Sequence, residues 1–259
     1  MLRKAKKLLD MALVATDGSI GEVEDFYFDD EAWTVRYLVV NTGSWLNKQQ
    51  VLISPRAIAS VDLTGNQVHV NLTKEQVQNS PDIDTHKPVS RQHEMALADY
   101  FGYPHYWRYP VLIGDPLYPA SIELHQPAVT KEIAEAAIKA EEELTDPHLR
   151  SIKTVTGYHL AASDGELGHV ADFLIEDETQ VIRYLVIATR TWLPGEQVLV
   201  APAWIDRLSW EEEKVFVQLS KEVISHSPVF DEAALTREYE KQLYQYYNRP
   251  AYWPDDGFE

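Results

Sequence analysis

The chain carries an internal duplication. Residues 17–84 align without a gap on residues 164–231 at a constant offset of 147, and 28 of the 68 aligned pairs are identical. Most of the retained residues are apolar or turn-forming, which is what a folding template requires. An ungapped repeat of this length predicts two copies of one fold. The repeat therefore indicates the architecture, whereas the biochemical task needs other signs.

A second match follows each repeat, after the offset changes to 146. It pairs Glu94 with Glu240, Leu97 with Leu243, Tyr100 with Tyr246, Pro104 with Pro250, Tyr106 with Tyr252, and Trp107 with Trp253. Each copy is thus predicted to have a body followed by a helix and an aromatic tail. We expect the first repeat with its tail over residues 1–107, a connector over 108–148, and the second repeat with its tail over 149–259.

The charge of the chain limits its partners. A net charge of −18 repels phosphates, so a nucleic-acid partner is not expected. A small cluster of basic residues lies at positions 3–7. This cluster could touch an anionic lipid surface or a ribosomal RNA loop. We interpret this cluster as a solvated chain end.

The composition also bears on the compartment. No apolar run approaches the ~20 residues needed to cross a bilayer; the densest, residues 198–205, contains Pro202. The basic start and the apolar residues 8–15 superficially resemble a secretory signal, but Asp10 interrupts them and they correspond to the internal residues 155–162. The absence of cysteine fits a reducing compartment. We expect a cytoplasmic protein without a transmembrane segment.

Short strands and turns dominate each copy. The pairs Asp17-Gly18 and Asp164-Gly165 stand between apolar stretches and predict tight hairpins, because glycine accepts a positive φ. Residues 51–53 and 198–200 are short and β-branched, as in buried strands, whereas residues 68–72 and 215–219 alternate, as in half-buried strands. We predict a mainly β fold of two tandem small antiparallel barrels with accessory helices.

Helices are predicted in each copy and in the connector between them. Thr73 and Ser220 are expected N-caps of a short helix in each copy, which a Ser-Pro pair ends. The connector is rich in proline and apolar residues, and we expect an ordered strap there. Within it, the apolar stripe of residues 130–144 predicts a helix.

Several blocks, in order and in both halves, resemble the PRC-barrel family. In the first copy they are residues 23–25, 36–40, 51–55 and 72–81, and the aromatic tail is also similar to that of free-standing bacterial members. The resemblance implies a small β-barrel of about six strands per copy. Relatives in this family include the cytoplasmic domain of the photosynthetic reaction-centre H subunit and the C-terminal domain of a ribosome maturation factor. The resemblance favours the free-standing group, for which it implies no common reaction.

Signs of catalysis or metal binding are weak. None of the nine histidines falls on another histidine at the repeat offset, and His93-Glu94 begins like a zinc-protease helix but has Leu97 where a second ligand is required. There is no glycine-rich phosphate loop, no Gly-x-Ser-x-Gly motif and no cysteine nucleophile. The acidic turns 29–31 and 176–178 lack the alternation and glycine of a calcium loop, so we interpret them as solvated hairpin turns. We therefore assign no catalytic, cofactor-binding or metal-binding residue and expect no cofactor.

Aromatic residues are the candidates for contact with a partner, because Tyr and Trp dominate protein interfaces. The candidates are Trp45, Trp192, Tyr106, Trp107, Tyr252 and Trp253. The alternative is that the tails fold back over their own barrels, since exposed aromatic patches are uncommon on monomers. Both interpretations remain open at this stage.

Three hypotheses of function follow. The first is a non-catalytic interaction or scaffold protein that binds a protein partner or associates with itself, with the two copies imitating a homodimer of single-barrel relatives. The second is a small-molecule binder or an unrecognised enzyme with a pocket between the barrels. The third is an accessory factor of a membrane complex in photosynthetic electron transport, which rests on the resemblance and the basic cluster of residues 3–7.

Overall fold

The computed structural model describes residues 1–43, 46, 50–81, 89, 91–106, 149–189 and 196–253. The chain divides into two compact units. The first comprises Met1–Lys153 and Glu176–Val181, and the second comprises Thr154–Ile175 and Ile182–Glu259. The connector and its expected helix over 130–144 lie outside the described residues. In the described ranges, no helix has the length and apolar character needed to span a membrane.

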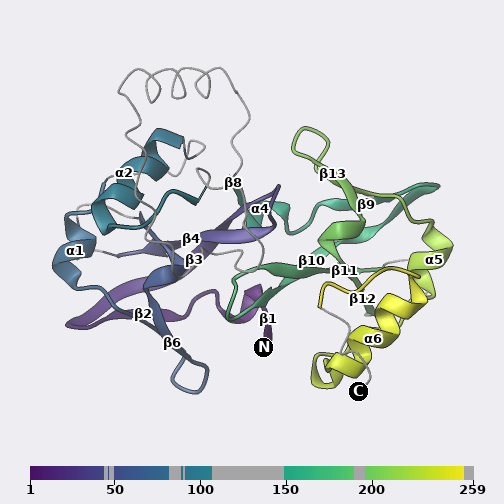
Figure 1. Cartoon of the computed structure of the whole chain (residues 1–259), viewed down its shortest axis with the longest axis horizontal. Coiled ribbons are helices and arrows are strands. Elements are labelled where there is room, and N and C mark those ends of the chain that lie inside the picture. The colour runs from purple at the N-terminus through teal and green to yellow at the C-terminus, as the bar shows by residue number, and fades with distance from the viewer. Residues whose placement is uncertain are drawn as a thin grey trace. The chain divides into compact units, whose positions relative to one another are not determined.

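A β-sheet forms the body of the first unit (Figure 1). Its strands are β2 (Ala12–Ala15), β3 (Gly18–Asp29), β4 (Thr34–Asn41), β5 (Gln50–Ile53), β6 (Ile58–Asp62) and β7 (Gln67–Val70). They are hydrogen-bonded in the order β5-β4-β3-β2-β7-β6. β1 (Leu2–Lys4) precedes them, and β8 (Leu149–Ser151) pairs with β3.

The second unit has the same order of strands, β12-β11-β10-β9-β14-β13. These strands are β9 (His159–Ala162), β10 (Gly165–Glu176), β11 (Ile182–Ala188), β12 (Gln197–Val200), β13 (Ile205–Ser209) and β14 (Lys214–Val217). The predicted mainly β class and the duplication of one topology are therefore confirmed.

Two details of the predicted barrels are wrong. First, β2 pairs with β7, and β9 with β14, in the parallel direction, because the chain crosses over before returning beside its first strand. Second, the sheets are not closed: in the described residues the path ends at β5 on one side and β6 on the other. The 3-10 turn η2 (Pro55–Ala57) joins these two strands, and a proline there lacks the N–H that a ladder needs.

Short helices lie before, between and after the strands in each copy. In the first they are η1 (Ala5–Lys7), η2 (Pro55–Ala57), α1 (Lys74–Gln78) and α2 (Arg91–Phe101). In the second they are α4 (Ile152–Val155), η4 (Pro202–Trp204), α5 (Lys221–Ser225), η5 (Glu232–Ala234) and α6 (Arg237–Tyr246). Thr73 caps α1 through the backbone of Gln76, and Ser220 caps α5, so both predicted N-caps are confirmed.

The repeated Asp-Gly pairs have two roles. Gly18 and Gly165 have φ values of 136° and 132°, which confirms the predicted positive φ at the hairpins. The preceding aspartates also bind the short helices: Asp17 Oδ1 accepts the N–H of Lys74, and Asp164 Oδ1 accepts that of Lys221, each at 2.8 Å. The identity of these pairs in both copies thus reflects a link between hairpin and helix.

A second glycine of each hairpin is retained for a different reason. A Cβ at Gly21 would lie 2.0 Å from the carbonyl oxygen of Asn41, and a Cβ at Gly168 would lie 2.0 Å from that of Ala188. No side chain fits between strands that approach this closely. The shared glycines therefore mark a close backbone contact in both sheets.

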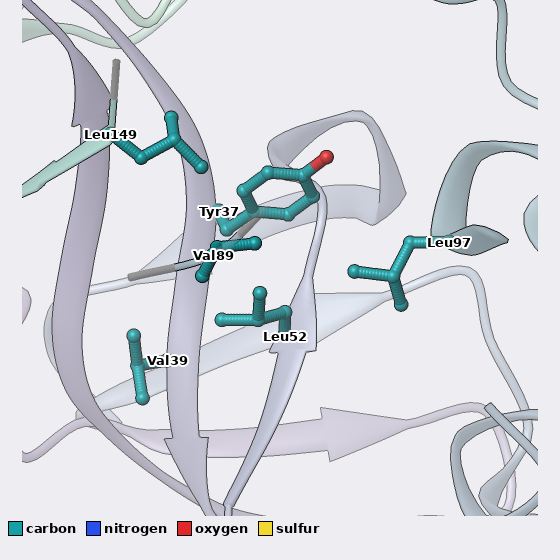
Figure 2. Close-up of a cluster of buried hydrophobic side chains, with 6 residues drawn as sticks. All are labelled: Tyr37, Val39, Leu52, Val89, Leu97 and Leu149. Carbon is teal, nitrogen blue, oxygen red and sulfur yellow. The ribbon is translucent and has the colours of Figure 1, made fainter. Parts of the chain in front are cut away.

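A hydrophobic cluster joins the sheet of the first unit to its helix (Figure 2). Its members are Tyr37, Val39, Leu52, Val89, Leu97 and Leu149. In Figure 2, Leu97 of α2 faces Tyr37 of β4 and Leu52 of β5. Leu149 belongs to β8, so a residue at the start of the second repeat completes the core of the first.

Ion pairs accompany this exchange of segments within the first unit. Arg150 of β8 binds Asp30, with Nε 2.6 Å from Oδ2, beside the β3–β4 hairpin. Arg3 of β1 binds Asp177, which belongs to the corresponding hairpin of the second repeat. The two arginines are themselves 147 residues apart, so the repeat extends to the N-terminal strand. Each repeat is preceded by a strand whose arginine binds the acidic turn of the other repeat.

Candidate functional site

The tail of the first repeat is bound to its own sheet through a buried glutamate. Tyr106 donates its hydroxyl hydrogen to Glu94 Oε2 at 2.6 Å, and Glu94 is buried on α2. The guanidinium of Arg36 lies 3.8 Å from the centre of the Tyr106 ring, within the range of a cation–π contact. Arg36 also binds Asp29 at 3.2 Å. Strand, helix and tail are therefore joined by one polar network.

The second repeat has the same network. Tyr252 donates to Glu240 Oε1 at 2.8 Å, and the guanidinium of Arg183 lies 4.1 Å from the centre of the Tyr252 ring. Tyr184 also donates to Glu240 at 2.8 Å, and Arg237 lies 2.9 Å from its other oxygen. The repeated Glu, Tyr and Arg thus attach each tail to the helix and strand of its own repeat.

The phenols of this network remain protonated at neutral pH. Burial, helped by nearby Glu240, raises the pKa of Tyr184 and Tyr252 well above the ordinary value of 10.0. Burial likewise raises the pKa of Tyr244 to about 12. These side chains therefore act as hydrogen-bond donors rather than as bases.

A pocket opens beside the network in the first repeat. It lies between β4, β5, η2, α2 and the tail, and it leaves about 20 Å³ in which the centre of a water molecule can move. Its apolar and aromatic lining includes Tyr37, Leu52, Ala98, Phe101, Tyr103 and Tyr106. Its polar lining consists of Arg36, Ser54 and Arg56. The free space is enough for about one water molecule and is far from the size of a ligand site.

The corresponding region of the second repeat is filled by rings. Where the first repeat has Ala98 and Ala57, the second has Tyr244 and Trp204. The Tyr244 ring centre lies 5.2 Å from that of Trp204 and 5.2 Å from that of Trp253. Trp204 in turn lies 4.4 Å from Tyr247. At these two positions the second repeat thus has rings where the first has alanines.

The rim of the pocket also differs between the copies. Ser54 and Arg56 of the first repeat are replaced by Ala201 and Ala203 in the second. Ser54 Oγ accepts the backbone N–H of Arg56 at 3.4 Å, and the exposed Arg56 side chain extends over the Tyr103 ring, 5.8 Å from its centre. The repeat that lacks the filling rings is thus the one with a hydroxyl and a guanidinium at the rim.

The structure describes three of the six predicted contact residues. Tyr106, Tyr252 and Trp253 each pack on their own repeat, and Trp253 lies against Tyr252 and, at 4.2 Å, under the Arg237 guanidinium. This agrees with the alternative that the tails fold back, while contact with a partner stays a prediction for them. Trp45, Trp107 and Trp192 lie outside the described residues.

The acidic turns differ from the solvated hairpins that were predicted. Asp29 is buried, and its Oδ1 accepts the N–H groups of Glu31 and Ala32, each at 3.0 Å. Asp30 binds Arg150, as described above. Asp29 caps its own turn and pairs with Arg36 of the same hairpin, whereas Asp30 is paired because it faces β8, a segment that the local sequence does not reveal. Among the residues the structure describes, no group of three His, Cys, Asp or Glu side chains could hold a metal ion.

The pocket itself was missed from the sequence. Its signal lies in positions that differ between the copies, namely 54, 56, 57 and 98, whereas the repeat is recognised from the positions that are shared. Where one copy of a duplicated helix has alanine and the other has tyrosine at the aligned position, the copy with alanine has the smaller side-chain volume. Such a difference becomes informative once both residues are known to face the same part of the fold.

Comparison with known proteins identifies the module. Residues 2–77, from β1 into α1, match the family model of the PRC-barrel domain, so this segment is similar to that domain. The predicted resemblance is thereby shown for these residues. Comparison with curated proteins gives no match.

Proposed function

We propose that this chain, with a PRC-barrel domain and an internal copy of the same topology, is a non-catalytic interaction protein that binds a protein partner. One observation carries the proposal: both repeats expose large apolar or aromatic side chains at equivalent positions. Exposed aromatic residues are typical of protein interfaces.

The first pair of positions lies on the last helix of each repeat. Tyr100 of α2 is 41% exposed and Tyr246 of α6 is 40% exposed. Both rings are held in place by the same bond, because Tyr100 donates to the carbonyl of Gln76 and Tyr246 to that of Val223. A ring that is exposed yet oriented loses little conformational entropy on binding.

The second pair lies at the tips of two β-hairpins. Leu63 follows β6 and is 50% exposed, and Trp210 follows β13 and is 49% exposed. These residues are also 147 positions apart. The chain thus offers two equivalent sets of contact residues, which suits a partner that is itself twofold symmetric.

The charge of the chain supports a partner with a basic surface. The acidic side chains exceed the basic ones by 41 to 23. Opposite charge accelerates encounter and adds specificity, and the acceleration falls as salt screens the charges. A basic protein surface that carries apolar recesses fits both properties. The lack of cysteine supports a reducing compartment, and we place the protein in the cytoplasm.

The basic N-terminal cluster gives less support to a membrane role. Arg3 is bound to Asp177, so one charge of the basic cluster is neutralised within the protein. Lys6 and Lys7 lie in the turn η1 rather than in an extended basic arm. We therefore prefer a protein partner to a membrane surface.

The test compares Tyr100→Ser/Tyr246→Ser with the matched control Ala96→Ser/Gln242→Ser, which changes exposed residues on the same helices. Sedimentation velocity measures self-association, and chemical cross-linking in native lysate at two salt concentrations identifies protein partners. We expect the tyrosine variant to lose at least tenfold in affinity for itself or for a basic partner, with unchanged circular dichroism. A wild type that stays monomeric and cross-links to the same proteins as the tyrosine variant would overturn the proposal.

A further inference from the structure

The first unit is completed by two segments that come from the second repeat. One is β8 (Leu149–Ser151), which pairs antiparallel with β3. The other is the turn Glu176–Val181, in which the carbonyl of Gln180 accepts the N–H of Val35 of β4 at 2.9 Å. The hairpin β3–β4 therefore offers a binding surface that a distant part of the sequence occupies.

The contacts of β8 on this surface are specific for its sequence. Leu149 is buried in the hydrophobic cluster (Figure 2). Arg150 Nε lies 2.6 Å from Asp30 Oδ2, and both side chains are largely buried. Ser151 donates its hydroxyl hydrogen to Asp25. An apolar contact, an ion pair and a hydrogen bond from three successive residues recognise a Leu-Arg-Ser strand by strand addition.

A matching set of contacts involves the first strand of the chain. Arg3 of β1 binds Asp177, whose backbone N–H donates to the carbonyl of Met1 at 2.9 Å. Each repeat thus gives a leading strand and presents an acidic turn to the leading strand of the other. Two identical partners make reciprocal contacts of this kind across a twofold axis. The covalent link between the repeats takes no part in them.

That link is long. Residues 107–148 separate Tyr106, in the tail of the first repeat, from Leu149. A chain of about 40 residues reaches up to roughly 140 Å when extended. A linker holds its two ends at an effective concentration that falls as the linker lengthens. The same contacts are therefore open to a second molecule, and a high protein concentration favours it.

We propose that two molecules of this chain exchange their second repeats. β8 and the turn Glu176–Val181 of one molecule bind β3 and β4 of the other, so the partner is a second copy of this chain. The net charge of −18 on each molecule opposes their approach, so exchange increases with salt, which screens the buried ion pair much less. The proposal is independent of the proposed function, because Tyr100 and Tyr246 lie on α2 and α6.

The experiment reverses the buried ion pair in two separate full-length chains. Asp30→Arg places two guanidinium groups in contact, and Arg150→Glu places two carboxylates in contact. In an equimolar mixture refolded together from urea, exchange brings opposite charges together at both contacts. The matched control is the double variant Asp30→Arg/Arg150→Glu, which restores the pair within one molecule. Sedimentation velocity measures dimer formation, and native mass spectrometry identifies the mixed dimer.

We expect at least tenfold more dimer in the mixture than in either single variant, and wild-type behaviour of the double variant. Circular dichroism tests folding; if the single variants do not fold alone, recovery of folding in the mixture supports exchange in the same way. A mixture without mixed dimers overturns the proposal in either case. The mixture is repeated with Tyr100→Ser/Tyr246→Ser in both chains. Loss of the dimer there would assign it to the tyrosines and would also overturn the exchange.

Discussion

The two repeats share a framework and differ in how it is filled. Both have the same strand order and the same hydrogen bond from an aspartate to a helix. In both, a buried glutamate at the equivalent position accepts a hydrogen bond from a tail tyrosine. The second repeat packs its tail and helix through a cluster of rings, whereas the first leaves a lined pocket. Duplication thus preserved the residues that set the backbone and left the residues that fill the interior free to diverge. In such a chain, shared buried positions indicate folding, and divergent buried positions show where the interiors of the copies differ.

The largest expected effect comes from opening the second repeat. Tyr244→Ala removes a buried ring that lies 5.2 Å from both Trp204 and Trp253, and we expect the free energy of unfolding to fall by about 3–5 kcal/mol. Urea denaturation followed by tryptophan fluorescence measures it. A loss below about 1 kcal/mol would show that the cluster collapses around the gap, and the comparison between a filled and an open repeat would then fail.

Alanine at the shared glycines tests the common framework. Gly21→Ala and Gly168→Ala each place a Cβ 2.0 Å from a backbone oxygen, so we expect a cost of about 3 kcal/mol at Gly21 and about 4 kcal/mol at Gly168, which also has a φ of 64°. Gly43→Ala is the control, because it has a positive φ but no atom within 4 Å of the added Cβ, and it should cost about 1 kcal/mol. Thermal unfolding of the three variants suffices. A smaller loss at Gly168 than at Gly21 would contradict the equivalence of the two sheets.

The two arginines of the leading strands give a smaller, graded effect. Arg150 and Asp30 are more deeply buried than Arg3 and Asp177. Arg150→Ala should therefore lower the free energy of unfolding by about 1.5–3 kcal/mol, as for a charged hydrogen bond, and Arg3→Ala by at most about 1 kcal/mol. Chemical denaturation in low and high salt distinguishes them. Equal losses would argue that burial does not separate the two pairs.

The smallest effect concerns the pH dependence of the first repeat. Burial raises the pKa of Asp25 above its ordinary 3.8, against hydrogen bonds from Ser151 and from the backbone of Lys153 and Phe26. The folded state therefore holds this proton more tightly than the unfolded chain does. The stability that the protonated group contributes is present below pH 3.8 and is lost as pH rises through the raised pKa.

Asp25→Asn cannot titrate, so wild type should lose stability relative to this variant as pH rises through that window, by at most about 1.4 kcal/mol per pH unit. Denaturation midpoints measured from pH 3.5 to 7 give the two slopes. Parallel curves would show that the carboxyl is as well solvated in the folded protein as in the unfolded chain.

The outline of the fold was predictable because it depends on local chemistry. The Asp-Gly hairpins, the N-caps Thr73 and Ser220, and the alternation in β7 and β14 each follow from neighbouring residues. The parallel pairing of β2 with β7 was not predictable, because alternation reports which face is buried and does not report strand direction.

The roles of the acidic turn and the alanines needed contacts from distant segments. Asp30 is an exposed turn residue by its sequence and an ion-paired one once β8 lies beside β3. Ala98 is an ordinary helix residue until its position opposite η2 and the tail makes it the wall of a pocket. In both cases the decisive neighbour lies far away in the sequence and comes close only when the two segments pack together.

By itself, the sequence determined that this protein has two copies of one mainly β unit, since a repeat of identical turn and core residues can only build the same backbone twice. It also determined the acidic surface. The tertiary structure alone decided that the leading strand of the second repeat completes the core of the first, and that one repeat has a pocket where the other has a ring. These features depend on which side chains pack against one another, and such contacts form only when segments distant in sequence come together.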